Sequence, residues 1–220
     1  MAMLTLAEEL MLLALDDETG KGSARSGLDQ GLAGAVLCEL VLAGRIAIID
    51  DRVVLRADGI IGEPVEDAVL AQVAAREKPR KPADWVGRLA GGVRRDVLAR
   101  LQERGLIRAE RHRVLGLLPS TRYPEADGSA EREVRERLDA VLAGGARPDE
   151  RTAALIAIAQ AARVGAALAG DRPWKEVEPR AKEIAEGDWA AAAVRKAIQS
   201  VNAAVLAATV AASSASVAGS

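Results

Sequence analysis

The stretch Leu4–Gly20, LTLAEELMLLALDDETG, decides how the fold begins. Thr5 can accept a hydrogen bond from the first turn of a helix, and Glu8 can reach back to the backbone of Thr5, which is the capping-box pattern. The leucines that follow recur at spacings of four and three residues, so they fall on one helix face: Leu6, Leu10 and Leu13. We therefore predict an amphipathic helix that begins after Thr5. Any helical domain could begin in this way, so the pattern alone indicates no function.

Composition narrows the class of protein. The chain has 220 residues, of which 50% are hydrophobic, enough for a sizeable core. Its net charge of −2 means that binding to nucleic acid or anionic lipid would need a local basic patch. Cys38 is the single cysteine, which excludes an intramolecular disulfide and fits a reducing cytosol. Arg far outnumbers Lys and Phe is absent, a bias typical of a GC-rich bacterial genome. We expect no signal peptide, because Glu8 and Glu9 interrupt the first apolar run.

Apolar periodicity and the positions of Gly and Pro predict a mainly α-helical chain. After the first helix, we expect helices at about 28–43, from Pro64, around Trp85 and Leu89, and at 93–104, 129–142, 153–168, 174–187 and 189–211. Gly44 should end the second helix and Ser129 should cap the helix at 129–142. Two β-hairpins are expected, at 46–55 and at about 107–118. The prediction is a single compact helical domain with small β-hairpins over residues 1–212, and a flexible Ser/Ala tail at 213–220.

One pattern occurs twice. Leu37-x-x-Leu40-x-x-x-Gly44-x-Ile46 has the same spacing as Leu98-x-x-Leu101-x-x-x-Gly105-x-Ile107. Each copy predicts a helix, a glycine stop and a strand, as in a winged-helix unit. The alternative is that helix-to-hairpin junctions commonly converge on this pattern, and the sequence leaves both open.

The C-terminal segment raises the question of a membrane span, because no Asp, Glu, Lys or Arg follows Lys196. Ala and Ser dominate it, and Gln199 and Asn202 interrupt it, whereas spanning helices depend on strongly apolar residues. We predict a buried core helix from about Trp189 to Ala211 instead.

Several blocks, in order, resemble the Golgi phosphoprotein 3 family. The opening stretch is similar to the family's Leu-Thr-Leu-x-Glu-Glu, followed by a leucine run, an Asp and a Gly. Gly31–Ile46 resembles its Gly-Leu-Arg-Gly…Glu-Leu…Gly-Arg block, and Asp84–Gly91 resembles its Asn-Trp…Leu-Leu-Ser-Gly segment. Arg104–Ile107 takes the place of a Lys-Gly-Val-Leu junction, and Asp149–Ile156 is similar to an Asp-Arg-Arg-x-x-Ala-Leu-Ile helix. The resemblance covers about residues 4–169.

The resemblance implies a helical domain that binds phosphatidylinositol 4-phosphate through three groups of residues. The family's membrane-facing Trp falls at Ala24 or Arg25 here, and the arginine of its Gly-Leu-Arg-Gly block is Ala33. Of its two basic residues three apart before the long helix, Arg147 is present and Glu150 takes the second place. We therefore expect Arg147 and Arg25 to contact a lipid headgroup, with weakened or altered specificity.

Two further expectations concern the shape of this site. Lys21, Arg25, Arg45 and Arg147 together could form a replacement anion site. We also expect the loop before Gly31 and the turn before Asp149 to meet in a shallow cationic pocket.

The same resemblance implies the partners and the location. The expected partners are an anionic phospholipid headgroup and the cytosolic tails of membrane proteins, and the hairpin near 114–124 is expected to join copies of the chain into a homo-oligomer. Such a protein would be cytoplasmic and reversibly associated with the inner face of the membrane. No catalytic residue and no cofactor are expected.

The residues agree with a protein that is not an enzyme. His112, the only histidine, has no partners at metal-ligand spacing, and Cys38 falls inside an apolar helix face. Gly20-x-Gly22 lacks the strand and helix that a phosphate-binding loop needs, and the run Asp16–Glu18 is typical of a helix end.

The alternative function is nucleic-acid binding by a winged-helix-like regulator. Seven arginines gather in the second helix-and-hairpin unit: Arg94, Arg95, Arg100, Arg104, Arg108, Arg111 and Arg113. In such a regulator they would contact phosphates. Glu103 and Glu110 dilute the charge, so we consider this alternative less favourable.

Overall fold

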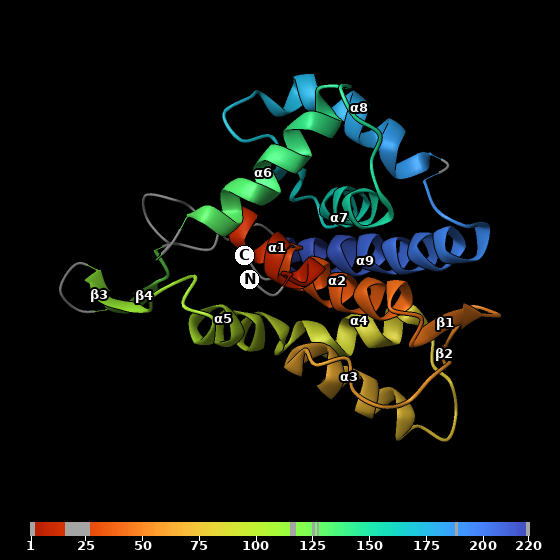
Figure 1. Ribbon diagram of the computed structural model, residues 1–220. Coiled ribbons are helices and arrows are strands. Elements are labelled where there is room, and N and C mark those ends of the chain that lie inside the picture. The colour runs from red at the N-terminus through yellow and green to blue at the C-terminus, as the bar shows by residue number, and fades with distance from the viewer. Residues whose placement is uncertain are drawn as a thin grey trace.

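Helix α2 (Leu28–Leu42) lies at the centre of the molecule, with other helices around it (Figure 1). The computed structural model describes residues 3–15, 27–114, 118–124, 126, 128–187 and 189–218. Buried residues occur on every side of α2, and a helix that is apolar all round is stable only when other elements cover it. The helices in contact with α2 are α1 (Leu6–Ala14), α3 (Pro64–Ala74), α4 (Pro82–Ala90), α5 (Val93–Glu103), α7 (Glu150–Ala161) and α9 (Ala192–Ala218).

The remaining elements cover the ends of this core. They are α6 (Ser129–Leu142), α8 (Trp174–Glu186), the 3-10 turn Gly165–Leu168, and two antiparallel hairpins, β1 (Ile46–Ile49) with β2 (Arg52–Leu55) and β3 (Glu110–Val114) with β4 (Leu118–Arg122). The prediction of a mainly α-helical domain with small hairpins is confirmed.

Helix α1 begins as the sequence predicts. The backbone N–H of Glu8 donates to Oγ1 of Thr5 (3.3 Å), and the backbone N–H of Thr5 donates to Oε2 of Glu8 (2.9 Å). The helix is not amphipathic, however, because all nine of its residues are buried. Glu8 and Glu9 are therefore inside the protein, where carboxylates need partners.

Three glycines allow α2 to approach its neighbours closely. A Cβ on Gly34 would lie 2.5 Å from Cγ2 of Val205 in α9, and one on Gly31 would lie 2.8 Å from Cβ of Ala162, just after α7. Gly27, before α2, has a φ of 110° and lies against the carbonyl oxygen of Ala162. The glycines of the Gly31–Gly34 block therefore fix the distance between packed helices.

The repeated pattern has a local cause in the backbone. Gly44 and Gly105 both adopt a left-handed conformation, with φ of 66° and 73°. The next N–H donates back into the last helical turn each time, from Arg45 to Leu40 and from Leu106 to Leu101, at 2.9 and 3.0 Å. This is the Schellman motif, which requires a residue without Cβ strain after the helix. The two copies therefore share a helix end, as the alternative to the winged-helix interpretation proposes.

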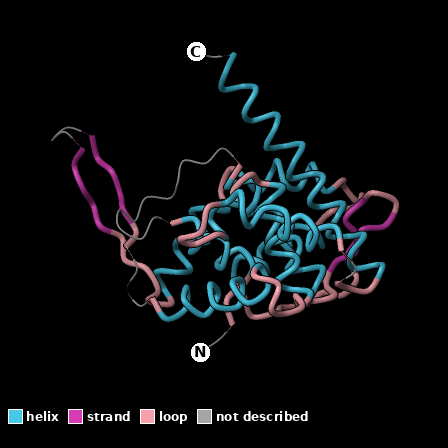
Figure 2. Tube along the Cα trace, turned by 90° about the horizontal axis from the view of Figure 1, so that it is seen from above, coloured by secondary structure: helices cyan, strands magenta, loops and turns pink. Residues whose placement is uncertain are grey.

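The two hairpins differ in their surroundings. In β1–β2, Ile46 pairs with Leu55, Asp50 and Asp51 form the turn, and the strands lie close to α3 and α9. The β3–β4 hairpin pairs Glu110 with Arg122 and extends away from the helical body (Figure 2).

Some helix boundaries differ from those predicted. Helix α7 ends at Ala161 and not near Leu168, because Arg163 adopts a left-handed φ of 57° and the N–H of Val164 donates back to Ala159 (2.9 Å). At the start of α6, Gly128 occupies the N-cap position, so the prediction that Ser129 caps this helix is wrong.

Helix α9 begins at Ala192 and continues beyond Ala211 to Ala218. One face, with Ile198, Val201 and Val205, is buried against α2, α4 and α7. By length and composition, Ala192–Ser214 could cross a membrane, with a mean hydropathy of 1.3, and 33% of this window is buried. The prediction of a core helix holds for the inner face, while the C-terminal end of α9 projects from the body (Figure 2).

Candidate functional site

A shallow hollow lies where the turn before α7 meets the end of α8. Its volume is about 220 Å³, and its lining consists of Arg147, Pro148, Arg180, Glu183, Ile184, Gly187 and Trp189. Asp149 is the N-cap of α7 and accepts a hydrogen bond from the backbone N–H of Thr152 (2.6 Å). This cap fixes the start of the helix and leaves Arg147, two residues earlier, exposed at the rim.

Arg147 supplies the unpaired charge of this hollow. Its guanidinium forms no ion pair with any residue that the structure describes, whereas Nη1 of Arg180 is 2.8 Å from Glu183. Trp189 and Ile184 add an apolar wall. Two guanidiniums against one carboxylate leave the lining with one positive charge in excess, an arrangement that can hold a phosphate oxygen by charge-assisted hydrogen bonds.

Acidic groups in the adjoining turn oppose this positive charge. Although partial burial disfavours its ionised form, hydrogen bonds from Thr152 lower the pKa of Asp149, so Asp149 is ionised at neutral pH. Glu150 is exposed at the first position of α7. Neither side chain lines the hollow, but both lie close in sequence to Arg147 and reduce its attraction for an anion.

The other predicted site residues lie elsewhere. Arg25, Lys21 and Ala24 are outside the described residues. Ala33 is fully buried in α2, so this position contributes nothing to a surface site. Arg45 follows α2 and donates to the carbonyl oxygens of Asp58 (3.1 Å) and Ile60 (3.3 Å), so its guanidinium holds a loop remote in sequence from the hollow.

The expected meeting of two loops is not seen among the described residues. Gly27, which ends the first loop, contacts Ala162 at the C-terminal end of α7. Asp149 marks the opposite end of that helix, about 20 Å away at 1.5 Å per residue. The described part of the first loop is therefore far from Arg147, and the rest of the loop lies outside the described residues.

Sequence reasoning missed Arg180, and it predicted the packing of Trp189 but not its place in the hollow. Helix α8 buries Val177, Ala181 and Ile184, and this spacing of four and three residues places Arg180 and Glu183 at the edge of its buried face. The periodicity could have shown that. It could not show which surface the edge would meet. Trp189 packs against the core, as predicted, and also forms a wall of the hollow.

The blocks that carry the family resemblance meet in a different place, inside the protein. We call the following residues the buried ion network: Glu8, Glu9, Glu39, Arg104, Arg137 and Arg151. Nη1 of Arg104 is 2.7 Å from Oε2 of Glu8, and Nη2 of Arg137 is 2.6 Å from Oε2 of Glu9. Arg151 contacts Glu39 (2.8 Å) and Glu9 (3.3 Å), and also donates to the carbonyl oxygen of Leu4. The network joins α1, α2, α5, α6 and α7.

Burial sets the protonation of the network. Desolvation raises the pKa of Glu8 and of Glu9, and their arginine partners offset only part of this effect. Glu66 of α3 is 1% exposed and lies near Thr5, Glu8 and Glu39, with no arginine partner among the described residues. Burial, helped by the charges of Glu39 and Glu8, raises its pKa to about 7.

The arginines that suggested nucleic-acid binding are largely neutralised. Arg94 pairs with Asp29 (2.5 Å), Arg95 with Asp96 (2.9 Å) and Arg104 with Glu8 (2.7 Å). Arg100 lies between Glu63 (3.5 Å) and Glu103 (3.6 Å). A phosphate backbone would have to compete with these carboxylates. Arg108 is exposed, and the side chains of Arg111 and Arg113 are outside the described part of the chain.

Among the described residues, few side chains are candidates for catalysis or for metal binding. Burial raises the pKa of the Cys38 thiol, which is completely enclosed in α2, as the sequence predicts for a core residue. Within the described residues, no group of three or more His, Cys, Asp or Glu is arranged to hold a metal ion. His112 lies on β3, and its side chain is not described.

Comparison with known proteins relates both regions to one family. The family model described as Golgi phosphoprotein 3 (GPP34) matches residues 6–201, which include the buried ion network and the hollow. Vacuolar protein sorting-associated protein 74 of Eremothecium gossypii is 28% identical over 163 residues, covering 63% of this chain and 49% of the relative. The chain therefore spans about half the length of the curated relative that it matches.

Proposed function

The chain belongs to the Golgi phosphoprotein 3 family, and from this premise we propose that it is a non-catalytic peripheral membrane protein that binds the phosphorylated headgroup of an anionic phospholipid. The ligand class that we infer is a phosphoinositide similar to phosphatidylinositol 4-phosphate. The protein would be cytoplasmic and associate reversibly with the inner face of the membrane. The observation that carries the proposal is the unpaired guanidinium of Arg147 beside that of Arg180 in one hollow.

The expected binding free energy at this hollow favours weak, reversible binding of the headgroup. A hydrogen bond to a charged group contributes about 1.5–3 kcal/mol, whereas micromolar affinity corresponds to about −8 kcal/mol. Arg147 and Arg180 together could supply about half of that, and Glu150 opposes it. Additional binding energy would come from the general attraction of the membrane surface, so specificity for one headgroup should be modest.

The test is vesicle flotation with three lipid compositions. Neutral phosphatidylcholine vesicles are compared with vesicles that also contain phosphatidylserine, and with vesicles that also contain phosphatidylinositol 4-phosphate. We expect the wild-type chain to float best with the phosphoinositide vesicles, and Arg147→Gln to remove that preference. Arg108→Gln is the matched control, since Arg108 is an exposed arginine in another part of the fold. Equal flotation with all three compositions would exclude headgroup recognition.

We also propose that the chain acts as a sorting or tethering adaptor that self-associates through the hairpin near 114–124. The hairpin extends from the body, and a two-stranded sheet has open edges that can pair with another copy (Figure 2). Its base is closed by hydrogen bonds from Arg108 to Pro124 (3.0 Å) and from Ala126 to Leu106 (2.9 Å). Replacing residues 110–122 by a short Gly-Ser linker should therefore leave the domain folded and convert an oligomer to a monomer in sedimentation velocity. Capture of membrane-protein tails would then be compared between the two forms.

Nucleic-acid binding is not proposed, because four of the seven arginines behind that alternative form ion pairs within the fold. We therefore expect no retention of this chain on duplex DNA at low salt, and retention there would contradict this conclusion.

A further inference from the structure

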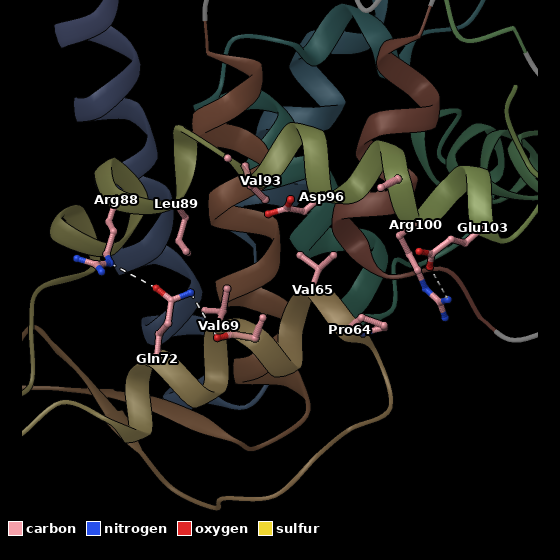
Figure 3. Close-up of a pocket in the computed structure, with 13 residues that line it drawn as sticks. Pro64, Val65, Val69, Gln72, Arg88, Leu89, Val93, Asp96, Arg100 and Glu103 are labelled. Atoms are coloured by element: carbon pink, nitrogen blue, oxygen red, sulfur yellow. Dashed lines mark hydrogen bonds and ion pairs between the residues drawn. The ribbon is translucent and has the colours of Figure 1, made fainter. Parts of the chain in front are cut away.

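A second and larger depression lies between α3 and the α4–α5 segment (Figure 3). Its volume is about 650 Å³, within the range of ligand sites, and no residue that lines it also lines the Arg147 hollow. The lining is largely apolar between its two ends: Val65, Ala68, Val69, Leu89, Val93 and Ala99. We call this depression the α3–α5 groove.

Helices α3 and α5 run antiparallel along the two sides of the groove. Glu63, just before α3, lies 3.5 Å from Arg100 near the end of α5, while Gln72 near the end of α3 accepts a hydrogen bond from Arg88, just before α5 (3.4 Å). The lining follows α5 from Val93 to Glu103, which is about 15 Å at 1.5 Å per residue. Figure 3 shows Arg88 and Glu103 at opposite ends.

The two ends carry opposite charge. At one end, Arg88 is exposed and forms no ion pair with any described residue. At the other end, Glu63 and Glu103 share the single guanidinium of Arg100, at 3.5 and 3.6 Å, so one carboxylate is in excess. Asp96, between the ends, is paired with Arg95 at 2.9 Å and adds no net charge.

We propose that the α3–α5 groove binds a short amphipathic segment of a partner protein. The segment places apolar side chains on the lining, a basic residue beside Glu63 and Glu103, and an acidic residue beside Arg88. A helix of about ten residues matches the groove in length, and an apolar face in an apolar groove is a common mode of peptide recognition. Because this groove is separate from the Arg147 hollow, the partner and a lipid headgroup can bind to the protein together.

The probe is a fluorescein-labelled helical peptide of twelve residues with leucines at spacings of three and four. One version carries Arg at one end and Glu at the other, and a second version carries Glu at both ends. Fluorescence anisotropy with the full chain should show tighter binding of the Arg/Glu peptide. In that complex the charged side chains at both ends of the groove each face a peptide residue of opposite charge.

Two variants test the location and the charge pattern. Ala99→Glu places a charge on the apolar lining and should weaken binding at least about tenfold, since a charge buried without a partner is costly. Ala140→Glu, at an exposed alanine on α6, is the matched control and should bind as the wild type does. Glu103→Arg gives the groove a cation at both ends and should reverse the preference in favour of the Glu/Glu peptide. A reversal cannot result from misfolding.

Three outcomes would overturn the proposal. The first is that the wild type binds neither peptide. The second is that Ala99→Glu and Ala140→Glu bind equally well, which would place the peptide elsewhere. The third is a wild-type dimer in sedimentation velocity that Ala99→Glu converts to a monomer, which would show that a second copy of the chain occupies the groove. Flotation of Ala99→Glu with phosphoinositide vesicles checks in parallel that the lipid site is intact.

Discussion

The buried ion network and the Arg147 hollow use the same side chain, arginine, in opposite ways. In the network, Arg104, Arg137 and Arg151 each face carboxylates in the interior. In the hollow, Arg147 is exposed and unpaired among the described residues, only four positions before Arg151. The start of α7 thus separates an arginine that holds the fold from one that can bind a ligand.

The sequence blocks that resemble the family supply most residues of the buried ion network. Four parts of the family pattern are far apart in sequence and meet in the buried ion network. They are the opening Glu8 and Glu9, the block with Glu39, the junction at Arg104 and the helix with Arg151. Removing one member of a buried ion pair leaves an uncompensated charge, so these residue types constrain one another. The blocks that identify the family therefore specify the fold, and they say little about the lipid.

The largest expected effect separates Arg151 from Arg147. Arg151→Met removes the arginine that pairs with Glu39 and one of the two that pair with Glu9, and it should lower the free energy of unfolding by about 3–5 kcal/mol. Arg147→Met, at an exposed position, should change it by less than about 0.5 kcal/mol. Urea denaturation followed by circular dichroism measures both. Equal losses would mean that the two arginines do not differ in role.

The second-largest expected effect is a pH dependence of stability, which arises from Glu66 beside the buried ion network. Glu66 has an ordinary pKa of 4.5 when unfolded and a pKa of about 7 when folded. Between these pH values the folded state keeps a proton that the unfolded state has lost, so stability falls as pH rises from about 4.5 to 7. Glu66→Gln should flatten this part of the profile and stabilise the protein by about 2–3 kcal/mol at pH 8. Urea denaturation at several pH values measures this, with exposed Glu150→Gln as a control that should keep the wild-type slope.

A smaller effect concerns the hollow alone. Glu150→Arg replaces a repulsive carboxylate by a guanidinium three residues after Arg147, in addition to the two guanidiniums that line the hollow, and one charge-assisted hydrogen bond is worth about tenfold in affinity. Flotation with phosphatidylinositol 4-phosphate vesicles should increase accordingly, with the urea midpoint nearly unchanged. If binding stays at the wild-type level, the hollow is not where the headgroup binds.

The smallest effect compares the two helix caps. Thr5→Ala and Asp149→Ala each remove an N-cap and should cost about 1 kcal/mol of stability. Thr5→Ala should cost more, because Thr5 also hydrogen-bonds Glu66. Only Asp149→Ala should raise headgroup affinity, since it removes a negative charge near Arg147. Denaturation and flotation of the same two variants decide whether the caps differ in this way.

Much of the fold could be predicted from local signals. The capping box at Thr5, the glycine stops at Gly44 and Gly105, and the helix start at Pro64 are all set by neighbouring residues. The break after Ala161 was missed because Arg163 adopts a backbone conformation that favours glycine. The burial of α1 on all sides was also missed, since its two glutamates suggest an exposed face until their distant partners are known.

The candidate site could be predicted only in part. The family resemblance predicts Arg147, as one of two basic residues before the long helix, and its role stays a prediction. Arg180 on α8 and Trp189 just after it reach the same hollow through packing. The α3–α5 groove had no sequence signal, because each of its walls reads as an ordinary amphipathic helix.

The amino-acid order alone determined the helix start at Thr5, the helix ends at Gly44 and Gly105, and which family the chain resembles, because caps, glycine stops and apolar spacing act between residues close in the chain. Only the tertiary structure decided which arginines are neutralised and which are available. That depends on whether a carboxylate more than thirty residues away, such as Glu39 for Arg151, is brought within hydrogen-bond reach in the interior.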